Sequence, residues 1–177
     1  MNEANKDQET RRMGRHMLLL GWAIGLAFLV YVFSGILDRQ HNPNQSIQSS
    51  TNARGMTEVE LLRNRMGHYV ANGYINDQPV VFLLDTGATV VSIPAGVADK
   101  LGLKAGAPSY ANTANGVIKT FSTRLDSIGV GKIRLRNINA HINPHMDGEQ
   151  ILLGMSFLKR LELTQKGDTL TLRQARP

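Results

Sequence analysis

Hydrophobic and polar positions follow two very different patterns along this chain. From Met17 to Leu37 the sequence MLLLGWAIGLAFLVYVFSGIL carries no charge and has no polar face. Its 21 residues, at about 1.5 Å each in a helix, match the roughly 30 Å hydrocarbon layer of a bilayer. The pattern predicts a single transmembrane helix over residues 17–37.

A cleaved signal peptide is the alternative interpretation of this apolar run. Signal cores are about 7 to 15 residues long and end near small residues, whereas this run is longer and FSGILDRQ is a poor cleavage site.

Three arginines in RRMGRH precede the run, and Arg39 alone follows it closely. Positive flanks stay in the cytoplasm. We therefore expect a single-pass protein of the cytoplasmic (inner) membrane, with residues 1–16 as a cytoplasmic tail and the rest exported, to the periplasm in a host with two membranes.

The pattern changes twice after the apolar run. Residues 38–59 are rich in Asn, Gln, Ser and Thr and contain few large apolar residues, which predicts a flexible tether. Residues 60–177 form short apolar runs separated by turn signals, which is typical of β-strands. The expected strands lie at 67–75, 79–84, 89–94, 118–128, 132–142 and 151–153, followed by a hairpin that turns at 166–168.

Helix signals are scarce in residues 60–177. One short helix is predicted over Ala95–Leu101, closed by Gly102, and another in MSFLKRL after Gly154. The fold class is therefore all-β with one or two short helices, preceded by a transmembrane helix. No cysteine is present, so an exported domain has no disulfide and must be stabilised by its core or by self-association.

Charge argues against a nucleic-acid partner. The chain has a formal net charge of +6, but the 14 Lys and Arg and 9 Asp and Glu from Glu60 onward are scattered. A mildly basic, solvated surface explains this distribution better than a nucleic-acid site.

One acidic residue stands out because of its surroundings. Asp85 ends the apolar run VVFLL, which reads as a strand buried on both faces, and Thr86 and Gly87 follow at once. A carboxylate entering such a site tends towards its neutral form, and a second carboxylate can share one proton with it. Such a pair performs general acid and base catalysis, which suits amide hydrolysis. No second D-T-G follows, so a second copy of the chain is the expected source of the other aspartate.

The sequence LLDTGAT, followed by ILLG and the helical MSFLKRL, resembles the retropepsin-like aspartic proteases. The resemblance is to the bacterial single-aspartate type with an N-terminal membrane anchor. It implies a closed β-barrel-type domain and a homodimer with Asp85 as the catalytic acid of each subunit. Thr86 would link the two loops across the dimer axis and Gly87 would admit substrate and water, while Ala88 and Thr89 complete the D-T-G-A-T form.

Two further elements follow from this resemblance. Gly154 would lie where the apolar-apolar-glycine strand crosses beneath the catalytic loop. Asn115, Gly116 and Val117 lie in SYANTANGVIKTF, whose Asn-Gly pair is a strong hairpin signal. In the family such a hairpin folds over the substrate as a flap, and its edge can bind an extended peptide by strand addition. An inert surface hairpin is the alternative.

A metal site is a weaker interpretation of HINPHMDGE. His141 and His145 have a spacing of four residues, and Asp147 and Glu149 follow, but Pro144 prevents the helix that would bring both rings to one face. We therefore expect solvated loop histidines, no metal and no cofactor.

Three other functions compete with a protease. D-T-G-A-T superficially resembles the phosphate loop of actin-like ATPases, but 118 residues cannot provide two large lobes. A haloacid-type phosphatase would need an aspartate at position 87, where glycine stands. The remaining rival is a non-catalytic, dimeric peptide-binding or scaffolding module of the same fold at the membrane surface. The expected function is a membrane-anchored aspartic endopeptidase that acts on peptide or protein substrates as a homodimer.

Overall fold

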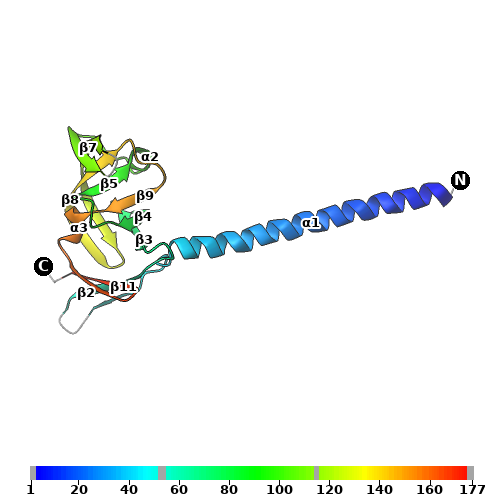
Figure 1. Ribbon diagram of the computed structural model, residues 1–177, viewed down its shortest axis with the longest axis horizontal. Helices are drawn as coiled ribbons and strands as arrows, with labels where there is room; N and C mark the ends of the chain where they lie inside the picture. Colours follow the sequence, from blue (N-terminus) through cyan, green and yellow to red (C-terminus); the bar gives the residue numbers. More distant parts are fainter. Residues whose placement is uncertain (1–2, 52–54, 114–115, 175–177) are drawn as a thin grey trace. The chain divides into compact units, whose positions relative to one another are not determined.

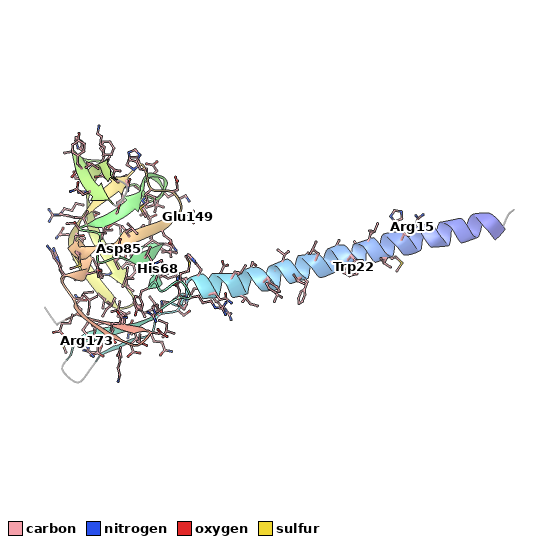
Figure 2. The ribbon with its side chains drawn as sticks, viewed as in Figure 1. Arg15, Trp22, His68, Asp85, Glu149 and Arg173 are labelled. Carbon is pink, nitrogen blue, oxygen red and sulfur yellow. The ribbon has the colours of Figure 1, made fainter. Side chains whose placement is uncertain are left out.

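The computed structural model describes residues 3–51, 55–113 and 116–174, and the chain divides into two compact units, residues 1–39 and 40–177. Helix α1, Glu3–His41, makes up the first unit and continues into the start of the second (Figure 1). Its segment Gly14–His41 is long and apolar enough to cross a membrane. The side chains of residues 17–37 are exposed, including Trp22 (Figure 2). The predicted span, residues 17–37, is therefore helical.

A curled seven-stranded sheet forms most of the second unit (Figure 1). The strand order is β3-β4-β9-β5-β8-β7-β6, and β3 also pairs with β7. Pairing is antiparallel except between β4 and β9 and between β5 and β8. Strand β6 remains at an edge, so the predicted barrel-type domain is confirmed in its mainly β architecture, although the barrel is not closed. The strands are β3 Val70–Ile75, β4 Gln78–Leu84, β5 Val91–Pro94, β6 Pro108–Thr113, β7 Gly116–Val130, β8 Ile133–Asn143 and β9 Gln150–Leu153.

A four-stranded antiparallel sheet joins the beginning of the second unit to its last strand. Its order is β1-β2-β11-β10. Alternate residues of the two central strands are buried: Val59 and Leu61 on β2, and Leu170 and Leu172 on β11. This side of the sheet therefore contributes to the hydrophobic core. The strands are β1 Ser49–Thr51, β2 Thr57–Leu62, β10 Glu162–Lys166 and β11 Thr169–Gln174.

Two short helices occur where the sequence predicts them. Helix α2, Ala95–Lys100, starts after Pro94, and Gly102 follows with a φ of 65° that suits glycine after a helix end. Helix α3, Met155–Leu158, follows Gly154 and buries Phe157 and Leu158. Helix α2 connects β5 and β6 of the curled sheet, whereas α3 connects β9 of that sheet to β10 of the four-stranded sheet.

The segment 38–59 differs from the flexible tether that its composition suggests. Asn44 is only 4% exposed. Its Nδ2 donates hydrogen bonds to Leu62 O at 2.9 Å and Val70 O at 2.7 Å, and its Oδ1 accepts one from Leu62 N–H at 2.7 Å. Hydrogen bonds thus order this polar segment, and two of its few apolar residues, Ile47 and Val59, pack in or against the core. Strands β1 and β2 also begin within this range, and residues 52–54 lie outside the described residues.

Candidate active site

Asp85 lies immediately after β4, in the loop that leads to β5 (Figure 2). Its backbone N–H donates to Leu153 O at 3.3 Å, which ties the loop to the end of β9. Its Oδ1 accepts a hydrogen bond from Gly87 N–H at 2.8 Å. The side chain is half-buried, whereas Thr86 and Gly87 are exposed. The carboxylate is therefore held in a defined orientation at a surface.

Gly87 allows the close approach that orients this carboxylate. A Cβ atom at position 87 would lie 3.1 Å from Asp85 Oδ1, which is tighter than most side chains tolerate. The next residue, Ala88, is half-buried and donates its N–H to Asp85 O at 3.3 Å, while Thr89 is exposed. The residues Asp85 to Thr89 thus form one compact turn.

Gly154 lies directly against this turn. A Cβ atom at position 154 would approach Val90 O to 2.3 Å and Ala88 O to 2.7 Å, so only glycine fits between β9 and the loop. The following N–H, of Met155, donates to Ala88 O at 2.8 Å. The structure therefore places Gly154 against the D-T-G-A-T turn.

Ser156 supports the same loop and was missed in the sequence. Its Oγ accepts a hydrogen bond from Val91 N–H at 3.0 Å, where the loop enters β5. A serine in the first turn of so short a helix was the available signal, because its hydroxyl is free to bond outside the helix. The loop after Asp85 is thus fixed at both ends by residues of the β9–α3 segment.

Strand β4 is less buried than its apolar sequence predicts. Only Phe82 is fully buried, while Leu83 and Leu84 are half-buried. Leu83 pairs in parallel register with Leu152 on β9, which is also half-buried. Side chains alternate between faces along a strand, so Leu83 and Leu152 share one face. The two side chains form a half-buried apolar strip near the end of β4, two residues before Asp85.

The predicted hairpin is present between β6 and β7. Its register pairs Thr113 with Gly116 and Asn112 with Val117. Gly116 has a φ of 110°, which favours glycine. Val117 is 66% exposed. Asn115 lies outside the described residues, and the role of this hairpin as a flap stays a prediction.

The two histidines of the rejected metal interpretation have different surroundings. His141, on β8, is half-buried, and its Nδ1 lies 3.2 Å from Thr120 Oγ1. Burial lowers the pKa of His141 below its ordinary value. His145 is exposed after β8, where its backbone N–H donates to Asn143 Oδ1. Among the described residues, no group of three or more His, Cys, Asp and Glu side chains is placed to hold a metal ion.

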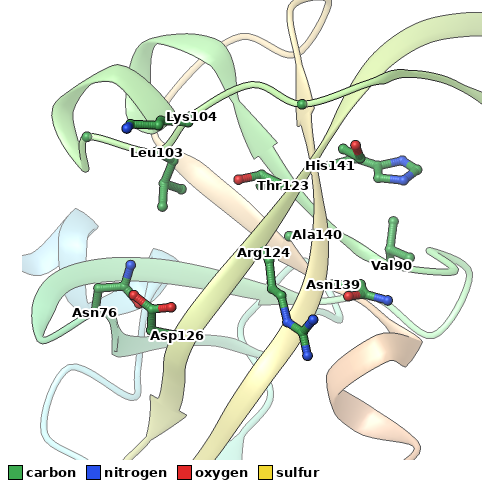
Figure 3. A pocket seen from close by; sticks show the side chains of 13 residues that line it. Asn76, Val90, Leu103, Lys104, Thr123, Arg124, Asp126, Asn139, Ala140 and His141 are labelled. Carbon is green, nitrogen blue, oxygen red and sulfur yellow. The ribbon is translucent and has the colours of Figure 1, made fainter.

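A hollow of about 730 Å³ lies beside the end of the Asp85 loop at Val90. Figure 3 shows Leu103 and Lys104, from the segment after α2, on one side of it and Arg124 and Asn139, from β7 and β8, on another. Its lining mixes charged, polar and apolar groups. Sequence patterns gave no sign of it, because the lining comes from segments far apart in the chain.

Residues 71–160, half of the chain, match the family described as gag-polyprotein putative aspartyl protease. The chain belongs to this aspartyl protease family. The matched range contains the D-T-G-A-T turn, the hairpin and Gly154.

Similar proteins agree with membership of the aspartyl protease family. The crystal structure of a retropepsin-like aspartic protease from Rickettsia conorii has a TM-score of 0.55 and 28% identity, and the match covers 73% of this chain and 95% of that one. The retropepsin-like fold is therefore confirmed.

An uncharacterized protein in the cobV 5′ region of Sinorhizobium sp. is 35% identical over 130 residues, covering 70% of this chain and 54% of the relative. An uncharacterized protein of Rickettsia prowazekii (strain Madrid E) is 32% identical over 109 residues, covering 59% and 46%. The chain thus spans about half the length of these curated relatives.

Proposed function

We propose that this chain is a membrane-anchored aspartic endopeptidase that hydrolyses peptide bonds in extended polypeptides. The observation that carries the proposal is the Asp85 turn. Its carboxylate is oriented by Gly87 N–H, and the loop is braced by Gly154 and Ser156. A non-catalytic binding module has no chemical need for so specific an arrangement around one carboxylate.

The second carboxylate would come from Asp85 of a second chain. A two-fold axis brings identical surfaces together, and Thr86 and Gly87 beside the aspartate are exposed for such a contact. Two neighbouring carboxylates share one proton, so one is ionised and one protonated. The ionised group takes a proton from water, whose oxygen attacks the peptide carbon, while the protonated group polarises the carbonyl. The C–N bond then breaks, and a proton passes to the leaving amine.

Substrate would bind as an extended strand beside this pair. The half-buried Leu83 and Leu152 offer an apolar surface for a side chain of the substrate. The β6–β7 hairpin, with Asn115, Gly116 and Val117, would cover the peptide as a flap and bind its main chain. The chemistry uses water and carboxyl groups, so it requires no metal or cofactor, and we expect chelators to leave the rate unchanged.

Helix α1 would anchor the enzyme through residues 17–37. The arginines before the span favour a cytoplasmic N-terminus, with the protease domain exported to the periplasm. Protease added to spheroplasts should therefore digest the domain. Full protection of residues 60–177 would contradict this topology.

Mixing wild-type and mutant chains tests the shared site. We expect Asp85→Asn to fold and dimerise without activity, because an amide cannot exchange the proton. Equal amounts of the two chains, re-paired at random, should retain about a quarter of the wild-type activity per total chain, measured as cleavage of unfolded polypeptide. Asp147→Asn, at an exposed position after β8, serves as the control and should remain active. A value near one half, with subunit exchange demonstrated, would mean that each chain has its own complete site.

A further inference from the structure

The loop Arg63–Gly67, which follows β2, is hydrogen-bonded to the point where the chain enters the second unit. Arg65 Nη1 donates to Gln40 Oε1 at 3.2 Å. Asn64 Nδ2 donates to His41 O at 2.9 Å. Gln40 is three residues beyond Leu37, where the proposed membrane span ends. Three helical residues cover only about 5 Å, so this loop lies close to the membrane surface for any direction of α1.

The loop is held in one conformation by a buried side chain. Asn64 is 7% exposed, and its Oδ1 accepts hydrogen bonds from Met66 N–H at 3.0 Å and His68 N–H at 2.9 Å. Gly67 N–H donates to Asn64 O at 3.0 Å, and its φ of 86° suits glycine. This rigid turn leaves the side chain of Met66 68% exposed. A large apolar side chain is therefore held out in solvent by a preformed loop.

A hollow of about 390 Å³ lies in the same loop. Arg63 forms an ion pair with Asp168 at its edge. Arg65 donates to the neutral side chain of Gln40, so the lining carries two guanidinium groups and one carboxylate. Guanidinium groups bind phosphate oxygens in a planar, two-point geometry. The lining consists of Arg63, Asn64, Arg65, Met66, Gly67 and Asp168.

We propose that this hollow binds the phosphate headgroup of an anionic membrane lipid, with Met66 inserted among the lipids beside it. The inference rests on the membrane anchoring in the proposed function. Basic side chains next to a bilayer are attracted to anionic headgroups, and an apolar side chain beside them enters the boundary between headgroups and acyl chains. A free phosphate ion offers the same charge but gives Met66 nothing to pack against. The partner is therefore a lipid.

The absence of cysteine from the sequence allows a direct test in the full chain. Met66→Cys carries a fluorescent label, and the protein is reconstituted into vesicles of phosphatidylcholine alone or mixed with phosphatidylglycerol. Brominated acyl chains quench a label that enters the bilayer. We expect stronger quenching in the phosphatidylglycerol vesicles. Val117→Cys is the matched control, because Val117 is 66% exposed on the β6–β7 hairpin, and its label should respond equally to both lipids.

Charge variants identify the side chain responsible. In the labelled chain, Arg65→Gln should lower the preference for phosphatidylglycerol about fivefold, as expected for one arginine near the surface. Arg65→Lys keeps the charge and should keep most of the preference. Arg124→Gln, which removes an exposed arginine on β7, should have no effect. An unchanged preference in Arg65→Gln would overturn the assignment of the site.

The remaining outcomes separate this inference from the anchor. Extraction of the chain from both vesicles by alkaline carbonate would overturn the membrane anchor. Retention of the chain with equal quenching at position 66 in both lipids would overturn headgroup binding and leave the anchor intact. Glycerol phosphate added to phosphatidylcholine vesicles should not reproduce the effect of the anionic lipid. If it did, the hollow would be a site for a free anion, and the lipid assignment would be wrong.

Discussion

Replacing Gly154 by alanine tests how the Asp85 loop is held. The new methyl group would lie 2.3 Å from Val90 O and 2.7 Å from Ala88 O. Both contacts are with backbone atoms, so no side-chain rotation relieves them. The loop and the β9–α3 segment must move apart, and the hydrogen bond of 2.8 Å from Met155 N–H to Ala88 O would be lost or weakened.

The expected loss of stability follows from these two effects. Overpacking a close-packed site costs about 1–3 kcal/mol, and a backbone hydrogen bond contributes about 1 kcal/mol net. We therefore expect Gly154→Ala to lower the free energy of unfolding by about 2–4 kcal/mol. For a domain of this size that corresponds to a fall in Tm of about 10 °C. The cleavage rate should also fall, because the same movement displaces Asp85.

Far-UV circular dichroism during heating in detergent, at the strand signal, measures this change. The fluorescence of Trp22 is unsuitable, because the single tryptophan lies in α1 and not in the protease domain. Gly96→Ala is the control, since nothing lies within 4 Å of a Cβ at that position in α2. Alanine there improves helix propensity by about 1 kcal/mol, so Tm should stay constant or rise slightly. Equal Tm values for Gly154→Ala and the control would refute the close packing described here.

Three other changes test separate parts of the structure. Ser156→Ala leaves Val91 N–H without its acceptor and should lower the unfolding free energy by about 1–3 kcal/mol in a urea titration; Ser156→Thr, which keeps the hydroxyl, should restore most of it. Asn44→Ala removes three hydrogen bonds and should cost about 3 kcal/mol, at about 1 kcal/mol each; unchanged urea stability would contradict the ordered segment. Burial lowers the pKa of His141 from its ordinary 6.5, so its contribution to stability is present above pH 6.5 and is lost as pH falls through the folded-state pKa. His141→Gln should therefore show a smaller fall in Tm from neutral pH to about pH 5, and a slope equal to that of wild type would contradict this.

Local signals in the sequence were sufficient for much of the fold. Asn76 and Asp77, between the strands expected at 67–75 and 79–84, have φ values of 48° and 64°, which these residues tolerate better than most. The strands on either side pair across this turn. Gly154 and Asp85 could be linked because the family pattern combines two motifs that are each short and local. Such features depend on neighbouring residues and are therefore readable without a structure.

The remaining features depend on partners far along the chain. Asn44 looks like a linker residue until Leu62 and Val70, 18 and 26 positions later, provide its hydrogen-bond partners. Leu83 pairs with Leu152 across most of the domain, and this pairing leaves their shared face half-open. Composition cannot show which side chains meet in this way. For the same reason the apolar sequence of β4 suggested more burial than the fold provides.

The pairing of β2 with β11 also affects when the domain can form during synthesis. Val59 lies opposite Leu172. Strand β2 can therefore pair with β11 only after nearly the whole domain has been synthesised. Contacts so distant in sequence form late and slowly. Until β11 has been made, β2 and β10 lack the strand that lies between them in the sheet. The four-stranded sheet is therefore completed only when residues 169–174 have been synthesised, and a chain cut before β11 would leave Val59 and Leu61 without the strand that they pair with.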